Sequence, residues 1–313
     1  MTIGKSAAIQ PPTARTDYRR HTRHPMKAAI IINPFSGKRQ APLVRRLAER
    51  IAADLGVALS VKTISGPRHG VELTRAAVSD GAERVLCAGG DGSLNAVATG
   101  LLGTTVPLGI VPMGSGNGYS RSLGIPQGAE DALRVALTGK PHPMDVGFLN
   151  DQPFLGTAGI GFDARVARRF DRTKGRGMIG YLRIILEEIA SARTIHVQVT
   201  ANGQSTETDL LMLVFCNSRE FGNGARISPA SCPDDGVAEL KLVSKPPLRS
   251  LPLAFLYLYT NRADRLRYIH SIPTTEAIVA QDGTIAHLDG EPVPIGHRVR
   301  FRLALHQLLV VVP

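Results

Sequence analysis

Short apolar runs alternate with segments of helical periodicity in the first part of the chain, and this alternation constrains the fold more than any other feature. Residues 28–32 are continuously apolar, which is typical of a strand buried on both faces. Apolar residues at four-residue spacing from Leu43 to Leu55 then predict a helix that ends at Gly56. Strands that alternate with helices predict a parallel α/β sheet. Further strands are expected at 57–61, 84–88 and 107–111, with helices over 71–78 and 94–101.

The pattern changes after Lys140, where few helices separate the predicted strands. Asn150-Asp151 lies between two apolar segments and predicts a hairpin, and Asn202-Gly203 predicts a second turn. We therefore expect an antiparallel β-sandwich or barrel in this half, with the boundary near residue 142. The expected strands are 195–200, 209–215, 238–243, 276–280, 299–303 and 308–312, and helices are expected over 163–170 and 181–191.

Composition is that of an ordinary globular chain with a basic balance. Hydrophobic residues make up 43% of the 313 residues, which is enough for a sizeable core in about two domains. Lys and Arg number 37 against 26 Asp and Glu, a net charge of +11 that favours anionic partners: nucleotides, nucleic acid or a phospholipid surface. Three cysteines, none in a CxxC pair, cannot form a disulfide scaffold and fit a reducing, cytosolic setting.

The first 25 residues are polar and carry several arginines against one acid, Asp17. This composition predicts a flexible basic tail rather than a transit peptide or a lipid anchor. No apolar stretch approaches the roughly 18 residues that a membrane span requires.

Three polar, glycine-rich loops follow predicted strands, at 33–37, 89–93 and 114–118. Ligands of parallel sheets bind beyond the carboxyl ends of the strands, so these loops are candidate ligand contacts. The first loop and Lys38 could hold a phosphate, although a turn with a helix cap is the simpler interpretation. In the second loop, Asp91 stands among three glycines and suits magnesium or a hydroxyl group, whereas the alternative is a plain Asp-Gly turn.

Neither of two common phosphate-binding motifs is present. The third loop departs from the dinucleotide fingerprint, because position 119 is Tyr where that motif needs Gly. A Walker A loop is excluded because Lys38 is followed by Arg39, and Ile32 stands where that motif needs Gly.

The order and spacing of these loops resemble the nucleotide-binding elements of the diacylglycerol kinase catalytic-domain superfamily, the lipid kinases that include soluble bacterial diacylglycerol kinases, sphingosine kinases and ceramide kinases. Later segments agree with the same superfamily, and the resemblance spans about residues 27 to 313. The matching segments are Asn33-Pro34-Phe35-Ser36-Gly37, Gly89-Gly90-Asp91-Gly92-Ser93-Leu94-Asn95, Pro112-Met113-Gly114-Ser115-Gly116-Asn117, Asp145-Val146-Gly147, residues 156–163, Asn217 with Gly222-Asn223-Gly224, Pro229, Asp234-Asp235-Gly236 and Asp289-Gly290-Glu291.

The resemblance implies a kinase of two domains. An α/β domain over 26–142 carries ATP, a β-sandwich over 143–304 carries the lipid, and a final strand at about 305–313 returns to the first domain. The implied nucleotide contacts are Asn33, Pro34, Phe35, Ser36, Gly37, Lys38, Thr63, Gly89, Gly90, Asp91, Gly92, Ser93, Asn95, Gly114, Ser115 and Asn117.

The resemblance also implies roles for acidic residues and for Mg²⁺. Asp91 and Asp145 would organise the catalytic magnesium. Asp235 and the main-chain oxygens of Cys232 and Val237 would hold a structural one. Asp289 and Glu291 match the position of the general base, which takes a proton from the lipid hydroxyl; a hairpin turn is the plain alternative for Asp289-Gly290-Glu291.

One departure bears on the acceptor lipid. Soluble bacterial diacylglycerol kinases usually read G-T-x-N-D at the third loop, whereas this chain has Gly118 in place of the acid and resembles sphingosine kinases there. We therefore expect a lipid kinase for diacylglycerol or a sphingoid-type lipid.

The segment 251–259 and the arginines after it suggest how such an enzyme reaches its lipid. An apolar stretch beside a basic one can dock on an anionic bilayer, and the alternative is a core helix with a charged face. The expectation is a cytoplasmic protein, peripheral at the inner membrane surface, with a homodimer left open.

Two other functions compete with this one. An NAD kinase shares the Gly-Gly-Asp-Gly loop and the α/β-plus-sandwich plan, but the motifs in the second half of this chain match the lipid kinases better. A nucleic-acid binder is allowed by the charge, yet the chain has no Trp, only 5% aromatic residues and no recognisable nucleic-acid motif, so no nucleic-acid partner is expected.

Overall fold

The computed structural model describes residues 24–37, 40–162 and 193–313. The predicted basic tail, Lys38 and the helices expected at 163–170 and 181–191 lie outside the described residues, apart from positions 24 and 25 of the tail.

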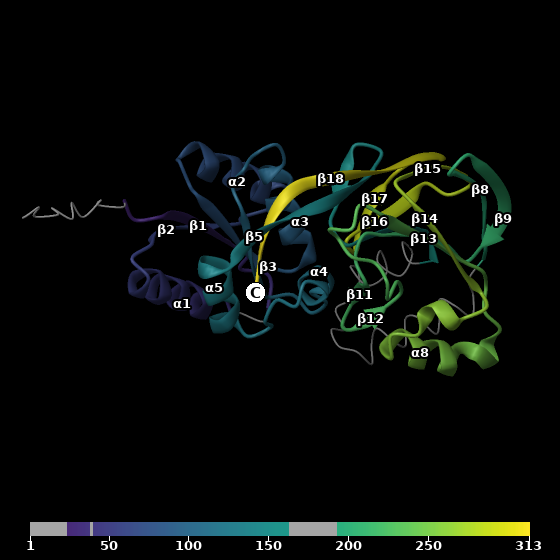
Figure 1. The fold of residues 1–313 in the computed structure, drawn as a ribbon, viewed down its shortest axis with the longest axis horizontal. Coiled ribbons are helices and arrows are strands. Elements are labelled where there is room, and N and C mark those ends of the chain that lie inside the picture. Colours follow the sequence, from purple (N-terminus) through teal and green to yellow (C-terminus); the bar gives the residue numbers. More distant parts are fainter. Residues whose placement is uncertain (1–23, 38–39, 163–192) are drawn as a thin grey trace, which may run out of the picture.

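A parallel sheet forms the first part of the molecule, as predicted. Its strand order is β2-β1-β3-β4, so β2 lies on one side of β1 and the later strands β3 and β4 lie on the other. Helix α2 packs on α3 on one face, and α1 packs on α5 on the other (Figure 1). The strands are β1 (Lys27–Ile32), β2 (Ala58–Thr63), β3 (Arg84–Gly89) and β4 (Leu108–Pro112), and the helices are α1 (Ala41–Asp54), α2 (His69–Ser79), α3 (Asp91–Leu101), α4 (Gly118–Ser122) and α5 (Ala129–Thr138).

The second part is a β-sandwich, as expected from the change of pattern. One layer has the order β14-β13-β10-β7-β16-β17, and the facing layer contains β18-β15-β8-β9. Side chains of both layers share one core, in which Phe215 of β10 stacks on Phe301 of β18. The strands are β7 (Thr157–Gly161), β8 (Ile195–Ala201), β9 (Gln204–Leu210), β10 (Met212–Cys216), β13 (Ala238–Val243), β14 (Ile269–Thr274), β15 (Glu276–Gln281), β16 (Ile285–Leu288) and β17 (Glu291–Pro294), with a small ribbon of β11 (Glu220–Gly222) and β12 (Ala225–Arg226) beside them.

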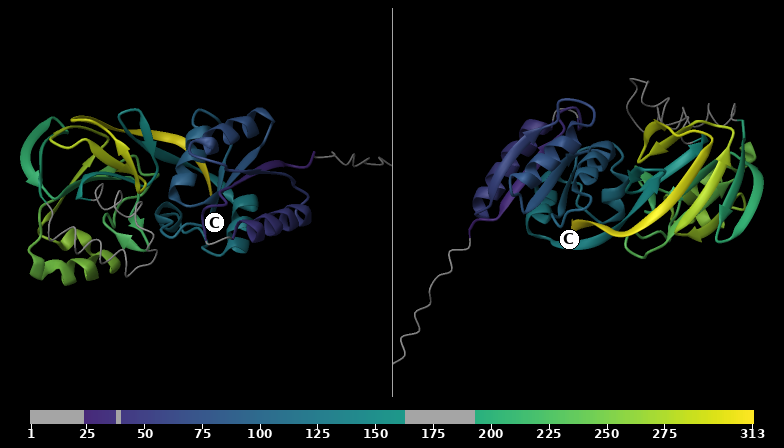
Figure 2. Two further views of the ribbon diagram at one scale, coloured as in Figure 1. Left: turned by 180° about the vertical axis from the view of Figure 1, so that it is seen from behind. Right: turned by 90° about the horizontal axis from the view of Figure 1, so that it is seen from above.

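One long strand, β18 (Arg298–Val312), joins the two parts into a continuous sheet. Its end pairs with β4 in parallel, which confirms that the last strand returns to the first part (Figure 2). It also runs antiparallel to β15 and to β5 (Lys140–Leu149), which forms the predicted hairpin with β6 (Gln152–Phe154).

The sequence prediction of two separate strands at 299–303 and 308–312 was wrong. The chain stays in one strand, and the pairing with β5 shifts register between Ala304 and Leu308. His306 adopts a left-handed φ of 52° within this irregularity. Its N–H donates to Asp145 Oδ1 at 2.8 Å. The buried carboxylate thus accepts a backbone N–H that is not paired with β5 where the register shifts. The domain boundary near residue 142 stays a prediction.

An arm of the second part carries α8 (Leu251–Tyr259) between the short helices η1 (Leu248–Ser250) and η2 (Ala263–Arg265). No residue of α8 is buried, so the alternative that this segment is a core helix is wrong. The arm is anchored by Lys241, a buried side chain of β13 whose Nζ donates to Asp264 Oδ1 and to Ser271 Oγ, both at 2.7 Å. Within the described ranges, no helix has the length and apolar character of a membrane span.

Candidate active site

The loops after β1, β3 and β4 meet at the carboxyl edge of the parallel sheet. Asn33 joins the first loop to the second: its N–H donates to the carbonyl of Ala88 at 2.9 Å, and its Nδ2 donates to Ser93 Oγ at 2.7 Å. The N–H of Met113 donates to the carbonyl of Gly89 at 2.8 Å and joins the third loop to the second. The three loops therefore form one rim.

Glycines let the backbones of these loops approach one another. A Cβ on Gly37, whose φ is 67°, would lie 2.6 Å from the carbonyl oxygen of Met113. A Cβ on Gly114 would lie 2.7 Å from the Cα of Gly90. Because these distances exclude any side chain, the glycines are needed for contact between the loops as well as for room around a ligand.

Asp289 reaches this rim from the second part of the molecule. It occupies a two-residue turn between β16 and β17 in which φ is 50° at Asp289 and 88° at Gly290. Left-handed conformations at both positions are typical of the Asp-Gly hairpin turn. The hairpin interpretation of this segment is therefore confirmed, and the same turn carries the carboxylate to the rim.

Four N–H donors hold the Asp289 carboxylate. Gly156 and Thr157 donate backbone N–H groups to Oδ1 at 2.7 and 3.2 Å. Leu155 donates its N–H to Oδ2 at 2.9 Å, and Asn95 of α3 donates through Nδ2 at 2.8 Å. The Asn95 contact is a direct bond between the two parts of the chain, and it fixes the carboxylate beside the glycine-rich loops.

Asp91 and Asp289 repel one another. Burial, and then the nearby charge of Asp289, raise the pKa of Asp91 to about 6, although N–H groups of Gly118 and neighbouring residues oppose the rise. Burial also raises the pKa of Asp289 above its ordinary value, against the opposing effect of its four donors. Two carboxylates in one partly desolvated site favour a bound cation or a shared proton.

Glu291 completes the acidic group from β17. Its exposed side chain lies against the second loop, because a Cβ on Gly92 would be 2.6 Å from Glu291 Oε1. Gly92 thus provides the space into which this carboxylate extends.

A single cavity of about 1300 Å³ joins the rim to the second part of the molecule. Eleven of the predicted site residues line it: Asn33, Phe35, Ser36, Gly90, Asp91, Gly92, Ser93, Gly114, Ser115, Asp289 and Glu291. Beyond Asp289 the lining is mainly apolar and comes from the sandwich and the arm, including Phe162, Leu211, Ile227, Val243, Leu258, Tyr259 and Ile269.

Other predicted residues lie behind this surface and support it. Asn95 holds Asp289, and Gly37 and Gly89 bring the loops together, whereas Asn117 donates to Gln127 Oε1 at 3.1 Å and packs on Gly114. Pro34 and Thr63 also lie outside the lining. Nucleotide contact by these residues stays a prediction.

Asp145 is fully buried and does not line the cavity. Its two carboxylate oxygens accept N–H groups of His306 at 2.8 Å and of Gly236 at 2.9 Å. These contacts tie β5 to β18 and to the Asp-Asp-Gly loop, so a structural role is visible in the described chain. The magnesium role expected for Asp145 stays a prediction.

The expected structural magnesium also stays a prediction. Asp235 Oδ1 accepts the N–H of Val237 at 3.0 Å, and His142 bonds Asp234 at 2.9 Å. Among the residues the structure describes, no group of three His, Cys, Asp or Glu side chains could hold a metal ion. A site built from Asp235 and two main-chain oxygens, those of Cys232 and Val237, would not form such a group.

The sequence reasoning missed the loop between β2 and α2, which also lines the cavity. Its lining residues are Ser65, Gly66, Pro67 and Arg68, whereas the predicted contact in this region was Thr63. A Ser-Gly-Pro turn shortly after the strand predicted at 57–61 was the available signal, because it stands at the same edge as the other three loops.

The missing acid at position 118 has a structural cause. A Cβ on Gly118 would lie 2.9 Å from the carbonyl oxygen of Glu220 and 3.1 Å from the backbone nitrogen of Gly222. Strand β11 thus occupies the space in which a side chain would stand. The N–H of Gly118 instead donates to Asp91 Oδ2 at 3.3 Å.

The residues around Asp91 and Asp289 fit a hydrated magnesium ion. Carboxylate oxygens and water are the ligands that Mg²⁺ prefers. The hydroxyls of Tyr119 and Ser218 are buried and have no hydrogen-bond partner among the described residues. Burial, and then the nearby charges of Asp289 and Asp145, raise the pKa of Tyr119. Unpaired buried hydroxyls beside carboxylates are suited to ordered water.

Replacing Gly118 by Ala should destabilise the fold by about 1–3 kcal/mol, because the new methyl group would press on the backbone of β11. Chemical denaturation measures the change. Gly66→Ala is the matched control, since a Cβ there meets nothing within 4 Å and the residue has no left-handed backbone. Equal stability of the two variants would contradict the proposed cause of the missing acid.

Asp91→Asn should stabilise the metal-free protein at pH 8. Since the pKa of Asp91 rises from 3.8 to about 6 on folding, its protonated form favours the fold below pH 4, and that contribution is lost as the pH rises through 6. Thermal unfolding with a chelator should show a gain on the order of 1–3 kcal/mol at pH 8 that vanishes near pH 4. A gain independent of pH would argue against charge repulsion as its source.

Comparison with known families agrees with this geometry. Residues 27–149 match the diacylglycerol kinase catalytic domain, and residues 156–307 match the YegS C-terminal NAD kinase beta sandwich-like domain. The chain is 31% identical over 222 residues to the Chromohalobacter salexigens protein named "Probable lipid kinase YegS-like", covering 68% of this chain and 70% of that protein.

Two further proteins are similar over nearly the whole chain. The Mycobacterium tuberculosis "Diacylglycerol kinase" is 27% identical over 280 residues, which cover 86% of this chain and 90% of that one. The crystal structure of a diacylglycerol kinase from Bacillus anthracis has the same fold, with a TM-score of 0.71 at 19% identity, over 92% of this chain and 97% of that one. The chain therefore belongs to the diacylglycerol kinase catalytic-domain family, and it is a lipid kinase, a phosphotransferase.

Proposed function

We propose that this kinase transfers the γ-phosphoryl group of ATP to the hydroxyl of a lipid that enters the cavity from a membrane surface. The observation that carries the proposal is the position of Asp289, which stands where the polar, glycine-lined half of the cavity meets its apolar half. A phosphoryl donor on one side and a lipid hydroxyl on the other would then meet at this carboxylate.

The nucleotide half supplies backbone N–H groups rather than a Walker loop. The loops at Gly90–Ser93 and Gly114–Ser115 expose main chain to the cavity, and Asp91 begins α3, whose N-terminus favours anions. Asp91 would hold Mg²⁺, which supplies charge neutralisation for the phosphates when bound.

Asp289 is suited to act as the general base. It would take the proton of the lipid hydroxyl as the oxygen bonds to the γ-phosphorus and the bond to the β-phosphate breaks, which releases ADP. Burial raises its pKa, and its bonds to Asn95 and the 155–157 backbone keep it oriented. Glu291 stands across the same space and is the competing base.

The apolar half favours a lipid acceptor over NAD. Its walls are formed by aliphatic and aromatic side chains of the sandwich and of α8. A dinucleotide acceptor would bring further phosphates and hydroxyls into this apolar space, where burial without polar partners is costly.

A lipid panel tests the proposal. The purified protein, ATP labelled in the γ position and Mg²⁺ are mixed with diacylglycerol, sphingosine, ceramide or undecaprenol in mixed micelles, and with NAD in a separate reaction. We expect one labelled lipid and no NADP. Label in NADP alone, or in no acceptor at all, would refute it.

Asp289→Asn should reduce kcat by about 10²–10⁴-fold while ATP still binds, because a positioned base supplies a factor of that size. Turnover and ATP titration measure the two quantities, and Asp282→Asn, an exposed aspartate in the segment between β15 and β16, is the matched control. If Glu291→Gln abolishes turnover and Asp289→Asn does not, the base is Glu291.

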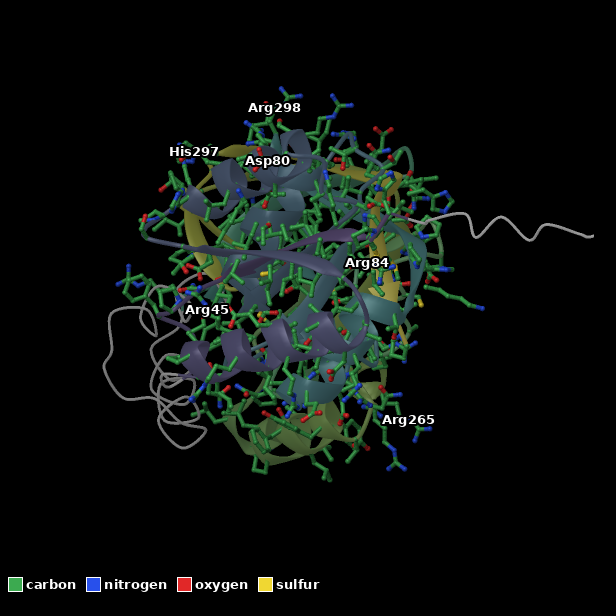
Figure 3. All side chains as sticks on the ribbon, turned by 90° about the vertical axis from the view of Figure 1, so that its left-hand side faces the viewer. Arg45, Asp80, Arg84, Arg265, His297 and Arg298 are labelled. Carbon is green, nitrogen blue, oxygen red and sulfur yellow. The ribbon has the colours of Figure 1, made fainter. Side chains whose placement is uncertain are left out.

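Membrane access would come through α8 and the turns beside it. Leu248, Leu253 and Leu256 are 60%, 47% and 53% exposed, and other α8 residues line the cavity. Exposed arginines flank α8 in the chain, at Arg249, Arg262, Arg265 and Arg267, and the side chain of Arg265 projects outward (Figure 3). Apolar side chains within a basic border suit an anionic bilayer.

The double substitution Leu253→Glu with Leu256→Glu should weaken binding to anionic phospholipid vesicles by about tenfold or more, because it replaces apolar insertion by repulsion. Vesicle co-sedimentation measures the effect. Leu43→Glu, at a leucine of α1 that is 50% exposed, is the control. Equal vesicle binding by the double variant and wild type would contradict docking through α8.

A further inference from the structure

Arg68 stands out in the charge balance of the cavity. Asp91, Asp289 and Glu291 all line it, whereas Arg68 is the one arginine or lysine among the lining residues that the structure describes. A triphosphate entering a space with three carboxylates is repelled unless cations accompany it. Arg68 is positioned to be such a cation.

The backbone of Arg68 is unusual for an arginine. Its φ is 62°, in the left-handed region, and the other described non-glycine residues with positive φ are all Asn, Asp or His. Those three residue types tolerate this region best. The backbone alone would therefore favour another residue at position 68, and strained positions of this kind gather at ligand sites.

Neighbouring contacts fix this conformation. Arg68 precedes α2 as its N-cap, and its carbonyl accepts the N–H of Val71 at 3.0 Å. The N–H of Ser65 donates to His69 Nδ1 at 3.1 Å and closes the loop around it. The side chain of Arg68 is exposed on the cavity and makes no hydrogen bond or ion pair with another described residue.

The start of α2 lies next to α3, the helix that Asp91 begins. A Cβ on Gly70 would lie 3.0 Å from the Cβ of Ala96, so the first turn of α2 contacts the second turn of α3. Arg68 is thus held at the edge of the rim, on the side of the parallel sheet rather than of the apolar half.

We propose that Arg68 binds the phosphate tail of the nucleotide. This inference rests on the proposed function, in which ATP occupies the rim. A guanidinium group offers a planar set of N–H donors that pairs two at a time with phosphate oxygens, and its charge balances part of the repulsion from the three acids.

Calorimetric titration of wild type and Arg68→Asn with ATP, ADP and adenosine, each with Mg²⁺ and without lipid, tests the inference. The variant should bind ATP and ADP on the order of tenfold to a hundredfold more weakly and bind adenosine as wild type does. Its melting temperature should be equal or higher, since Asn fits the left-handed backbone better. If Arg68 had only a structural role, its substitution would not lower the affinity for ATP while the melting temperature stayed the same.

Two further variants separate the possibilities. Arg68→Gln keeps the long side chain without its charge and should lose as much ATP affinity as Arg68→Asn. Arg75→Gln, at an exposed arginine of α2 away from the cavity, should leave the ATP affinity unchanged. Unchanged ATP affinity in both Arg68 variants, or an equal loss for ATP and adenosine, would overturn the inference. A wild-type protein that binds no ATP would overturn the proposed function as well.

Discussion

The mutual contact of three glycine-bearing loops is the constraint on which the rest of the site depends. Gly37 meets the third loop at Met113, Gly90 meets Gly114, and Asn33 bonds Ser93 across the first two loops. A side chain at any of these glycines would separate strands β1, β3 and β4 at their carboxyl ends. Close packing therefore creates, at one place, both a stretch of exposed main chain and the start of α3 that presents Asp91.

The second half of the molecule is placed relative to this rim by β18 and by Asp289. Strand β18 continues the parallel sheet into the sandwich, and Asn95 bonds Asp289 across the junction. The result brings Asp91 near Asp289, an arrangement that is unfavourable for the empty protein because burial and repulsion raise the pKa of Asp91. A cation bound near the two carboxylates would reduce this repulsion.

The fold and the rim were predictable because their causes are local. Continuous apolar runs and glycine loops at strand ends define the parallel sheet, and Asp289-Gly290 is a hairpin signal in its own right. Features that depend on distant backbone were not predictable. The single strand β18 needs Asp145 at its irregularity, Gly118 is dictated by β11, and the left-handed Arg68 is a property of the folded β2–α2 loop. The resemblance implied a nucleotide contact at Thr63, whereas the cavity is lined by the residues that follow it, from Ile64 to Arg68.

A crystal structure of the complex with a non-hydrolysable ATP analogue and Mg²⁺ would show whether the three loops and the Asp91–Asp289 pair form the nucleotide site. We expect phosphate density against the main chain of Gly90–Ser93 and Gly114–Ser115, with the metal on Asp91 and the terminal phosphate facing Asp289. Nucleotide bound elsewhere, or phosphates pointing away from the Asp91–Asp289 pair, would contradict this expectation.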